Sequence, residues 1–227
     1  ALSFLTCAHN GSDADNDSLT PSYVWSNLST GVNYSSITTT LQLSASNTSP
    51  TDTVQCSVTV DDGNGGTATL SDTVLIENTE PTFSIPATIS APNGTEVGDT
   101  LTCFAVGTDL EDGALTPTYQ WQSSNGSVIG SGDTLTLTAS NSNPTEAVTC
   151  VATLTDSHGG TASSNASETV TNSSPIFDVS ASILPSSGVL TSTSLTCTGA
   201  ASDADGDTPG LSYQWSNSNG STYSSTS

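Results

Sequence analysis

The chain has 227 residues, of which 22 are acidic and none is lysine or arginine, so its formal net charge is −22. Nucleic-acid binding needs Lys and Arg to neutralise phosphates, and attraction to anionic membranes needs the same cations, so the composition argues against both partners. No apolar run approaches the length of a bilayer span, and we expect no direct membrane insertion in this segment.

In chain order, the sequence predicts short β-strands separated by turns. Apolar side chains alternate with polar ones at 41–45 and 54–60, and the same pattern returns at 135–139 and 148–154. A period of two is typical of strands that bury one face. Gly and Pro clusters interrupt these segments at short intervals, and none has helical periodicity. The pattern therefore favours an all-β sandwich or barrel.

A pattern of cysteine and tryptophan recurs along the chain. Its members are Cys7, Trp25 and Cys56, then Cys103, Trp121 and Cys150, then Cys197 and Trp215. The tryptophan follows the first cysteine by 18 residues each time, and the pattern returns after 96 and then 94 residues. Periods of this length match one small domain. We expect three repeats: 1–80, which lacks its first strand, 81–174, which is complete, and 175–227, which ends after its third strand.

The five cysteines are too regularly spaced to be accidental. Pairs Cys7–Cys56 and Cys103–Cys150 would close loops of similar length, and Cys197 would pair with a cysteine outside this sequence. Disulfides indicate an oxidising, extracellular setting. The alternative is that each cysteine is a small, free core residue. A metal–thiolate site is disfavoured, since no two cysteines lie close in sequence.

The cysteine–tryptophan–cysteine arrangement resembles the immunoglobulin fold, in which the tryptophan packs on an inter-sheet disulfide. The stretches 60–81 (VDDGNGGTATLSDTVLIENTEP) and 202–215 (SDADGDTPGLSYQW) are similar to bacterial immunoglobulin-like, PKD-like and cadherin-like repeats of large surface proteins and adhesins. This resemblance implies tandem immunoglobulin-like β-sandwich domains, each with an inter-sheet disulfide, joined at 77–83 and 172–177. In the second repeat it implies strands near 82–90, 99–106, 117–123, 133–139, 146–155 and 161–171.

Acidic residues gather in turns that join these strands. One turn of each repeat contains Asp13, Asp15 and Asp17, or Asp109, Glu111 and Asp112, or Asp203, Asp205 and Asp207. A second acidic turn contains Asp62 in the first repeat and Asp156 in the second, and the first linker adds Glu77 and Glu80. Alternating carboxylates in a tight turn suit Ca²⁺, which takes six to eight oxygen ligands. The alternative is that they are solvated Asx turns, chosen for their backbone conformation.

The resemblance brings the two acidic turns of a repeat together at one pole, beside the preceding linker. There Asp109, Glu111 and Asp156 would share a Ca²⁺ site with Glu77 or Glu80, and the bound ion would stiffen the junction. The second linker has Asn172 and Ser173 in place of those acids, so we expect a weaker site there.

Catalysis is not expected. His158 follows Asp156 closely, but its counterpart in the first repeat is Asn64, so an ordinary turn residue suffices at that position. No nucleophile elbow and no Ser–His–Asp pattern is recognisable.

Glycans are possible partners of this chain. Ten Asn-x-Ser/Thr acceptor sequences occur, at Asn10, Asn16, Asn27, Asn33, Asn47, Asn93, Asn125, Asn165, Asn172 and Asn219. In a chain this rich in Ser and Thr, many of these sequences arise by chance.

The sequence thus predicts a structural protein: the repeat region of an extracellular bacterial fibre, filament or giant adhesin stalk at the cell surface. Its contacts would be with neighbouring repeats or with copies of itself. The alternative function is a carbohydrate- or protein-binding immunoglobulin-like module of a secreted protein. That function needs exposed aromatic side chains, for which Tyr34 and Tyr223 are candidates in a chain that is only 5% aromatic.

Overall fold

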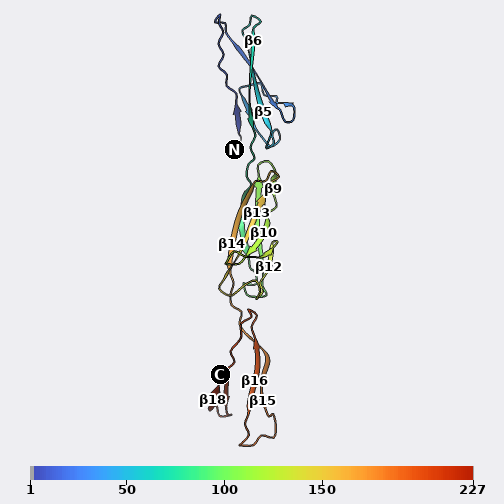
Figure 1. Ribbon diagram of the computed structural model, residues 1–227. Helices are drawn as coiled ribbons and strands as arrows, with labels where there is room; N and C mark the ends of the chain where they lie inside the picture. Colours follow the sequence, from blue (N-terminus) through green and yellow to red (C-terminus); the bar gives the residue numbers. More distant parts are fainter. Residues whose placement is uncertain (1–2, 227) are drawn as a thin grey trace. The chain divides into compact units, whose positions relative to one another are not determined.

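The computed structural model describes residues 3–226 (Figure 1). These residues form eighteen strands, paired in antiparallel sheets, and no helix. The first half contains β1 (Phe4–Thr6), β2 (Thr20–Asn27), β3 (Val32–Asn33), β4 (Thr40–Gln42), β5 (Thr53–Asp61), β6 (Thr67–Leu75), β7 (Thr82–Ser90), β8 (Thr100–Asp109) and β9 (Gly113–Leu115). The second half contains β10 (Thr118–Gln122), β11 (Val128–Ser131), β12 (Thr134–Thr136), β13 (Ala147–Thr155), β14 (Thr161–Thr169), β15 (Ile176–Leu184), β16 (Thr196–Ser202), β17 (Tyr213–Ser216) and β18 (Thr222–Thr226). None of the described residues forms a helix long and apolar enough to cross a bilayer.

The chain divides into two compact units. The first contains the residues through Ile85 together with Val106–Pro117 and Leu154–Ala162. The second contains Pro86–Ala105, Thr118–Thr153 and the residues from Ser163 onward. Strands β7, β8, β13 and β14 each contribute residues to both units. The boundaries inferred from the sequence repeat, 1–80, 81–174 and 175–227, remain a prediction.

In the first unit, a four-stranded sheet has the order β3-β2-β5-β6, and β1 pairs with β4. Side chains of β5 alternate between buried and partly buried positions, as a strand with one core face requires. Trp25 on β2 lies in register with Cys56 on β5, and Cys56 is bonded to Cys7 just after β1. Trp25 Nε1 donates a hydrogen bond of 2.9 Å to the carbonyl of Thr38, so its one polar group is satisfied in the core.

The second unit holds the same combination. Its strands belong to a sheet of order β11-β10-β13-β14 and to one of order β12-β8-β7. The disulfide Cys103–Cys150 joins β8 to β13, and therefore links the two sheets. Trp121, fully buried at 0% exposure, lies in register with Cys150, and its Nε1 donates a hydrogen bond of 3.0 Å to the carbonyl of Gly132. Both predicted disulfides are therefore confirmed.

The all-β prediction is also confirmed, and each strand expected in the second repeat is present: β7, β8, β10, β12, β13 and β14. Two further short strands, β9 and β11, were not expected; they pair with β8 and β10.

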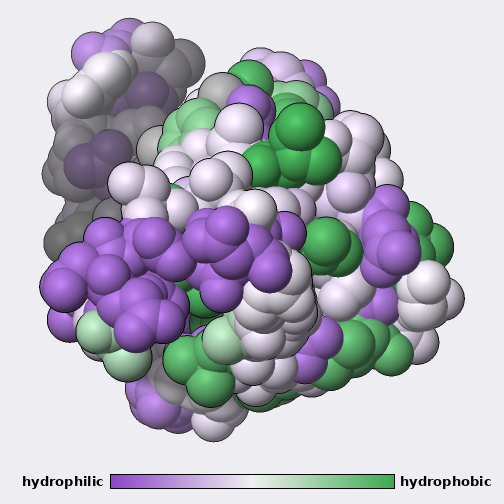
Figure 2. Space-filling view, turned by 90° about the horizontal axis from the view of Figure 1, so that it is seen from above, coloured by the Kyte–Doolittle hydropathy of each residue, from purple (hydrophilic) through white to green (hydrophobic). Residues whose placement is uncertain are grey.

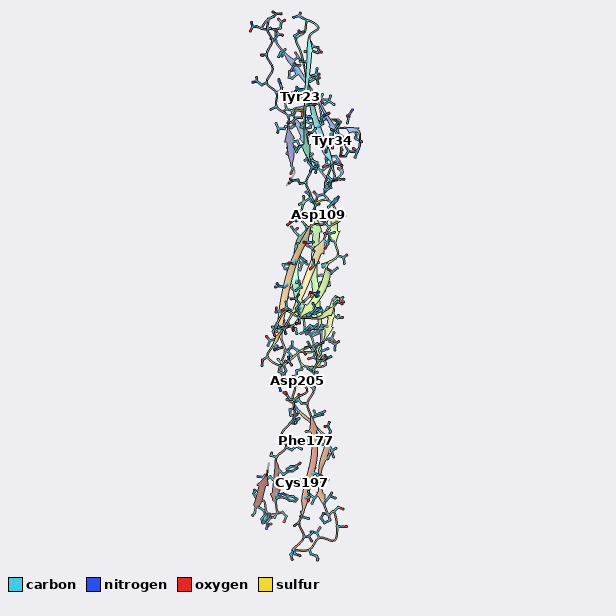
Figure 3. The ribbon with its side chains drawn as sticks, in the orientation of Figure 1. Tyr23, Tyr34, Asp109, Phe177, Cys197 and Asp205 are labelled. Carbon is cyan, nitrogen blue, oxygen red and sulfur yellow. A yellow bond between two sulfur atoms is a disulfide. The ribbon has the colours of Figure 1, made fainter. Side chains whose placement is uncertain are left out.

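The residues after Ser174 form two separate strand pairs, β15–β16 and β17–β18. Every residue of β15 is exposed, including Phe177. Cys197 on β16, labelled in Figure 3, is a partly buried free thiol, and its disulfide stays a prediction. Apolar side chains also reach the surface elsewhere, and Figure 2 shows them interspersed with hydrophilic ones on the face that it views.

Candidate metal centre

The acidic turn that follows each repeat's first cysteine has one hydrogen bond in common in all three repeats. The first aspartate, Asp13, Asp109 or Asp203, accepts with its Oδ1 the backbone N–H two residues on, at 2.8, 2.8 and 2.9 Å. This is the Asx turn that short acidic side chains favour. The first carboxylate is therefore used to shape the loop, and the residues that follow present the remaining oxygens.

The second acidic turn wraps a carboxylate in backbone N–H groups. Asp156 Oδ1 accepts the N–H groups of His158 and Gly160, both at 2.8 Å. The hydrogen bond from the Asn78 side chain, followed by those from Gly160 and His158, lowers the pKa of Asp156 below its ordinary value. A glycine is needed at position 160, because a Cβ there would lie 2.2 Å from Asp156 Oδ2. Asp156 is consequently a buried, ionised group.

The first linker contacts both acidic turns of the second repeat. Asn78 Nδ2 donates a hydrogen bond of 2.8 Å to Asp156 Oδ2. Thr79 Oγ1 donates one of the same length to Glu111 Oε1. Asn78 and Thr79, which are neighbours in the linker, therefore each hold a different acidic turn. These two side chains and their partners, Asp156 and Glu111, all belong to the first compact unit.

Three oxygen atoms of this cluster are buried without a hydrogen-bond partner among the described residues: Asn78 Oδ1, Asp109 Oδ2 and Glu111 Oε2. Asp109, labelled in Figure 3 at the end of β8, is only 6% exposed. Leaving a buried acceptor unpaired costs about 1–3 kcal/mol, and more when it is charged. The sequence has no Lys or Arg that could neutralise these carboxylates. Carboxylate and amide oxygens are the ligand types that Ca²⁺ takes, so the donor set fits this ion.

The two turns of the second repeat also hold each other. Asp112 accepts hydrogen bonds from the N–H and the hydroxyl of Ser157, at 2.7 and 2.8 Å. These two bonds, and to a smaller extent nearby His158, lower the pKa of Asp112. One ligand atom each from Asp112, Asp156 and His158 lies within 4.8 Å of the other two. Both Asp112 and His158 are exposed, unlike the three partnerless oxygens.

The predicted linker ligands stand outside the hydrogen-bonded cluster, although Glu77 lines the same hollow as Glu111. Glu77 and Glu80 are exposed, and neither has a hydrogen bond to the acidic turns within residues 3–226. Asn78, between them in sequence, occupies the position next to Asp156. Sequence reasoning missed Asn78 and Thr79; the available signal was that these two residues, and not Glu77 and Glu80, align with Asn172 and Ser173 of the second linker.

In the first repeat the two acidic turns also meet. Asn64 Nδ2 donates a hydrogen bond of 2.8 Å to Asp17 Oδ2. Asp62 accepts the N–H groups of Asn64 and Gly66, which lower its pKa. Asp15 is exposed, and none of these carboxylates has a buried partnerless oxygen in the part of the chain that is described.

At the second linker, Ser173 donates its backbone N–H and its hydroxyl to the two oxygens of Asp205, at 2.6 and 3.1 Å. Ser173 aligns with Thr79, so both linkers hold the following acidic turn by a hydroxyl. Asp203 shapes that turn, and Asp207 is exposed. None of the described residues in this segment has a buried side-chain oxygen without a hydrogen-bond partner.

No protein-family model matches the chain, and no curated protein matches it. Its repeats, sheets and linker chemistry are therefore the basis for a functional proposal.

Proposed function

We propose that this chain is the repeat region of an extracellular bacterial fibre, filament or giant adhesin stalk, built from tandem immunoglobulin-like β-sandwich domains. The observation that carries the proposal is the repetition of one core in two repeats. Trp25 lies in register with Cys56, and Trp121 with Cys150, and the bonded cysteines are 49 and 47 residues apart. A tandem array of one domain provides length and durability, which are the properties of a stalk.

The disulfides support the extracellular part of this proposal. Such bonds persist in oxidising compartments and are rare in the reducing cytosol. Each adds about 2–4 kcal/mol by restricting the unfolded chain. A surface fibre exposed to dilution and proteolysis benefits from that stabilisation.

We further propose that Ca²⁺ binds at the first linker, where Asn78 Oδ1, Asp109 Oδ2 and Glu111 Oε2 would be ligands. The ion would supply the positive charge that the sequence lacks and would satisfy three buried acceptors. Because Asn78 belongs to the linker and the other two to the following loop, binding would restrict movement of the linker. The second linker, with Ser173 bonded to Asp205 and no orphaned oxygen among the described residues, would respond more weakly.

The two tyrosines that the sequence offers as contacts for a binding module both form hydrogen bonds within the chain. Tyr34 is half-buried, and its hydroxyl donates to the carbonyl of Asn47 at 3.0 Å. Tyr223 is 71% exposed, but it accepts a hydrogen bond from Asn217. Phe4, Phe104 and Phe177 are exposed as well, so the repeated core, and not the aromatic side chains, is what favours a stalk over a binding module. We propose no catalytic activity for this chain.

Electron microscopy of native material, in Ca²⁺ and in EDTA, tests both parts of the proposal. Uniform filaments that bend more sharply in EDTA are expected, because removing the ion frees the linkers. Filaments of unchanged stiffness would exclude the calcium junction while leaving the fibre intact. Discrete monomers in both conditions would overturn the fibre and favour the binding module.

A further inference from the structure

Acceptor sequences for N-glycosylation are over-represented among the asparagines. The chain has 15 asparagines, and ten of them begin an Asn-x-Ser/Thr sequence. Ser and Thr together make up 80 of the 227 residues, so chance placement would give about five. This excess over chance is modest by itself. The structure shows a second difference between the asparagines inside these sequences and those outside them.

Asparagines outside these sequences all have a structural role. Each donates a hydrogen bond from Nδ2 to another residue, at distances of 2.7–3.1 Å. They are Asn64, Asn78, Asn141, Asn143 and Asn217. The asparagines outside acceptor sequences therefore hold turns and linkers through their side-chain hydrogen bonds.

Most asparagines inside the acceptor sequences lack such a role. Six are exposed and form no side-chain hydrogen bond within residues 3–226: Asn10, Asn16, Asn33, Asn93, Asn165 and Asn219. Asn16 has a φ of 64°, a conformation that asparagine tolerates better than most residues, so its backbone accounts for it. Asn93 and Asn219 are third residues of turns closed by hydrogen bonds from Gly94 to Ala91 and from Gly220 to Asn217, where asparagine is common. Asn10, Asn33 and Asn165 have no such explanation in their own conformation.

Two of these three lie on strands, where asparagine is disfavoured. Asn33 is on β3 and Asn165 is on β14, and each of these strands is at the edge of its four-stranded sheet. An exposed edge strand is a template for unwanted pairing, and proteins commonly guard it with lysine. This chain has no lysine. A bulky hydrophilic group on these asparagines would guard both edges in its place.

We propose that Asn33 and Asn165 carry N-linked oligosaccharides, with Asn10, Asn93 and Asn219 as further sites. In this reaction the side-chain nitrogen bonds to the anomeric carbon of a lipid-pyrophosphate-linked oligosaccharide. The bond from that carbon to the phosphate oxygen breaks, the lipid pyrophosphate leaves, and the amide loses one proton to the transferase. The proposal depends on export of the chain, which is part of the proposed function, but not on fibre formation.

The acceptor sequence at Asn27 provides an internal control. Asn27 is 2% exposed, its Nδ2 donates a hydrogen bond of 2.7 Å to Asp52, and its Oδ1 accepts two backbone N–H groups. A glycan there would destroy the local core. Asn27 should therefore be unmodified in folded protein.

Glycopeptide mass spectrometry of native protein tests the proposal. Cleavage must be at acidic or aromatic residues, because trypsin has no site in this sequence. Enzymatic release of N-glycans in ¹⁸O-water should leave labelled aspartate at positions 33 and 165 and not at 27. An intact mass equal to that of the bare polypeptide would overturn the proposal. So would sugar found on serine and threonine alone.

Matched variants made in the native host sharpen the result. Asn165→Gln and Ser167→Ala should each remove the mass of one glycan, since Ser167 completes the acceptor sequence. Ser163→Ala, on the same exposed face of β14, should remove none. Equal loss in all three variants would refute the assignment. Unglycosylated filaments would contradict only this inference, whereas glycosylated monomers would contradict only the fibre.

Discussion

Replacing Asp109 by asparagine should abolish the response to Ca²⁺ without unfolding the protein. Asp109 Oδ1 accepts the N–H groups of Glu111 and Asp112, at 2.8 and 3.0 Å, and an asparagine carbonyl can accept both. The turn should therefore survive. The new amide nitrogen replaces the partnerless Oδ2, so the site loses an anionic ligand and gains a donor.

The size of the effect follows from ligand linkage. An ion present at 100 times its Kd stabilises the folded state by about 2.7 kcal/mol. In a domain of the expected size, each kcal/mol raises Tm by about 4–8 °C. The wild-type protein should consequently gain about 10–20 °C between EDTA and saturating Ca²⁺, and Asp109→Asn should gain almost nothing.

Calorimetry or circular dichroism in EDTA and in excess Ca²⁺ measures this difference. Asp133→Asn is the matched control, because it makes the same change at an exposed position of the second compact unit, outside the site, and should keep the full shift. The reasoning fails if Asp109→Asn retains the wild-type shift, or if Asp133→Asn loses it to the same extent. Isothermal titration of both variants gives an independent count of bound ions.

Three further predictions concern stability and Ca²⁺ binding. Reducing the disulfides, which close loops of 49 and 47 residues, should cost about 4 kcal/mol per bond; an unchanged urea midpoint would contradict this. Gly160→Ala should weaken Ca²⁺ binding, because its Cβ would lie 2.2 Å from Asp156 Oδ2 and would displace the carboxylate that holds the proposed ligand Asn78. Gly210→Ala, whose Cβ would have nothing within 4 Å, should be neutral in the same titration. Acid should destabilise the protein, because the folded pKa of Asp156 is lowered, chiefly by the hydrogen bond from Asn78. The contribution of Asp156 to the free energy of unfolding is complete above its ordinary pKa of 3.8 and disappears as pH falls through the lower folded pKa. Urea midpoints measured against pH should fall less for Asn78→Ala, and equal slopes would refute that origin.

Much of the fold was predictable because burial alternates with sequence. Val148, Cys150, Ala152 and Leu154 were expected on one face of a strand, and all four are buried. Strand β9, Gly113–Leu115, was missed because three residues are too few to show a period.

The site was predicted less completely, for a different reason. Carboxylates such as Asp109 and Glu111 are recognisable in a sequence, but the direction of each linker side chain is not. Charge alone favoured Glu77 and Glu80, whereas the side chain that contacts Asp156 belongs to the neutral Asn78 between them. Successive residues of an extended linker point in different directions, and only coordinates show which one faces the loop.

The position of the disulfides also limits how far the chain can lengthen under tension. A pulling force that unfolds a repeat cannot extend the segment enclosed by an intact disulfide, and the bonded cysteines are 49 positions apart for Cys7–Cys56 and 47 for Cys103–Cys150. At about 3.5 Å per extended residue, each bond withholds roughly 160–170 Å of contour length. A pulled repeat therefore releases only about half of its length, and reduction would release the other half, so that the extension per repeat roughly doubles.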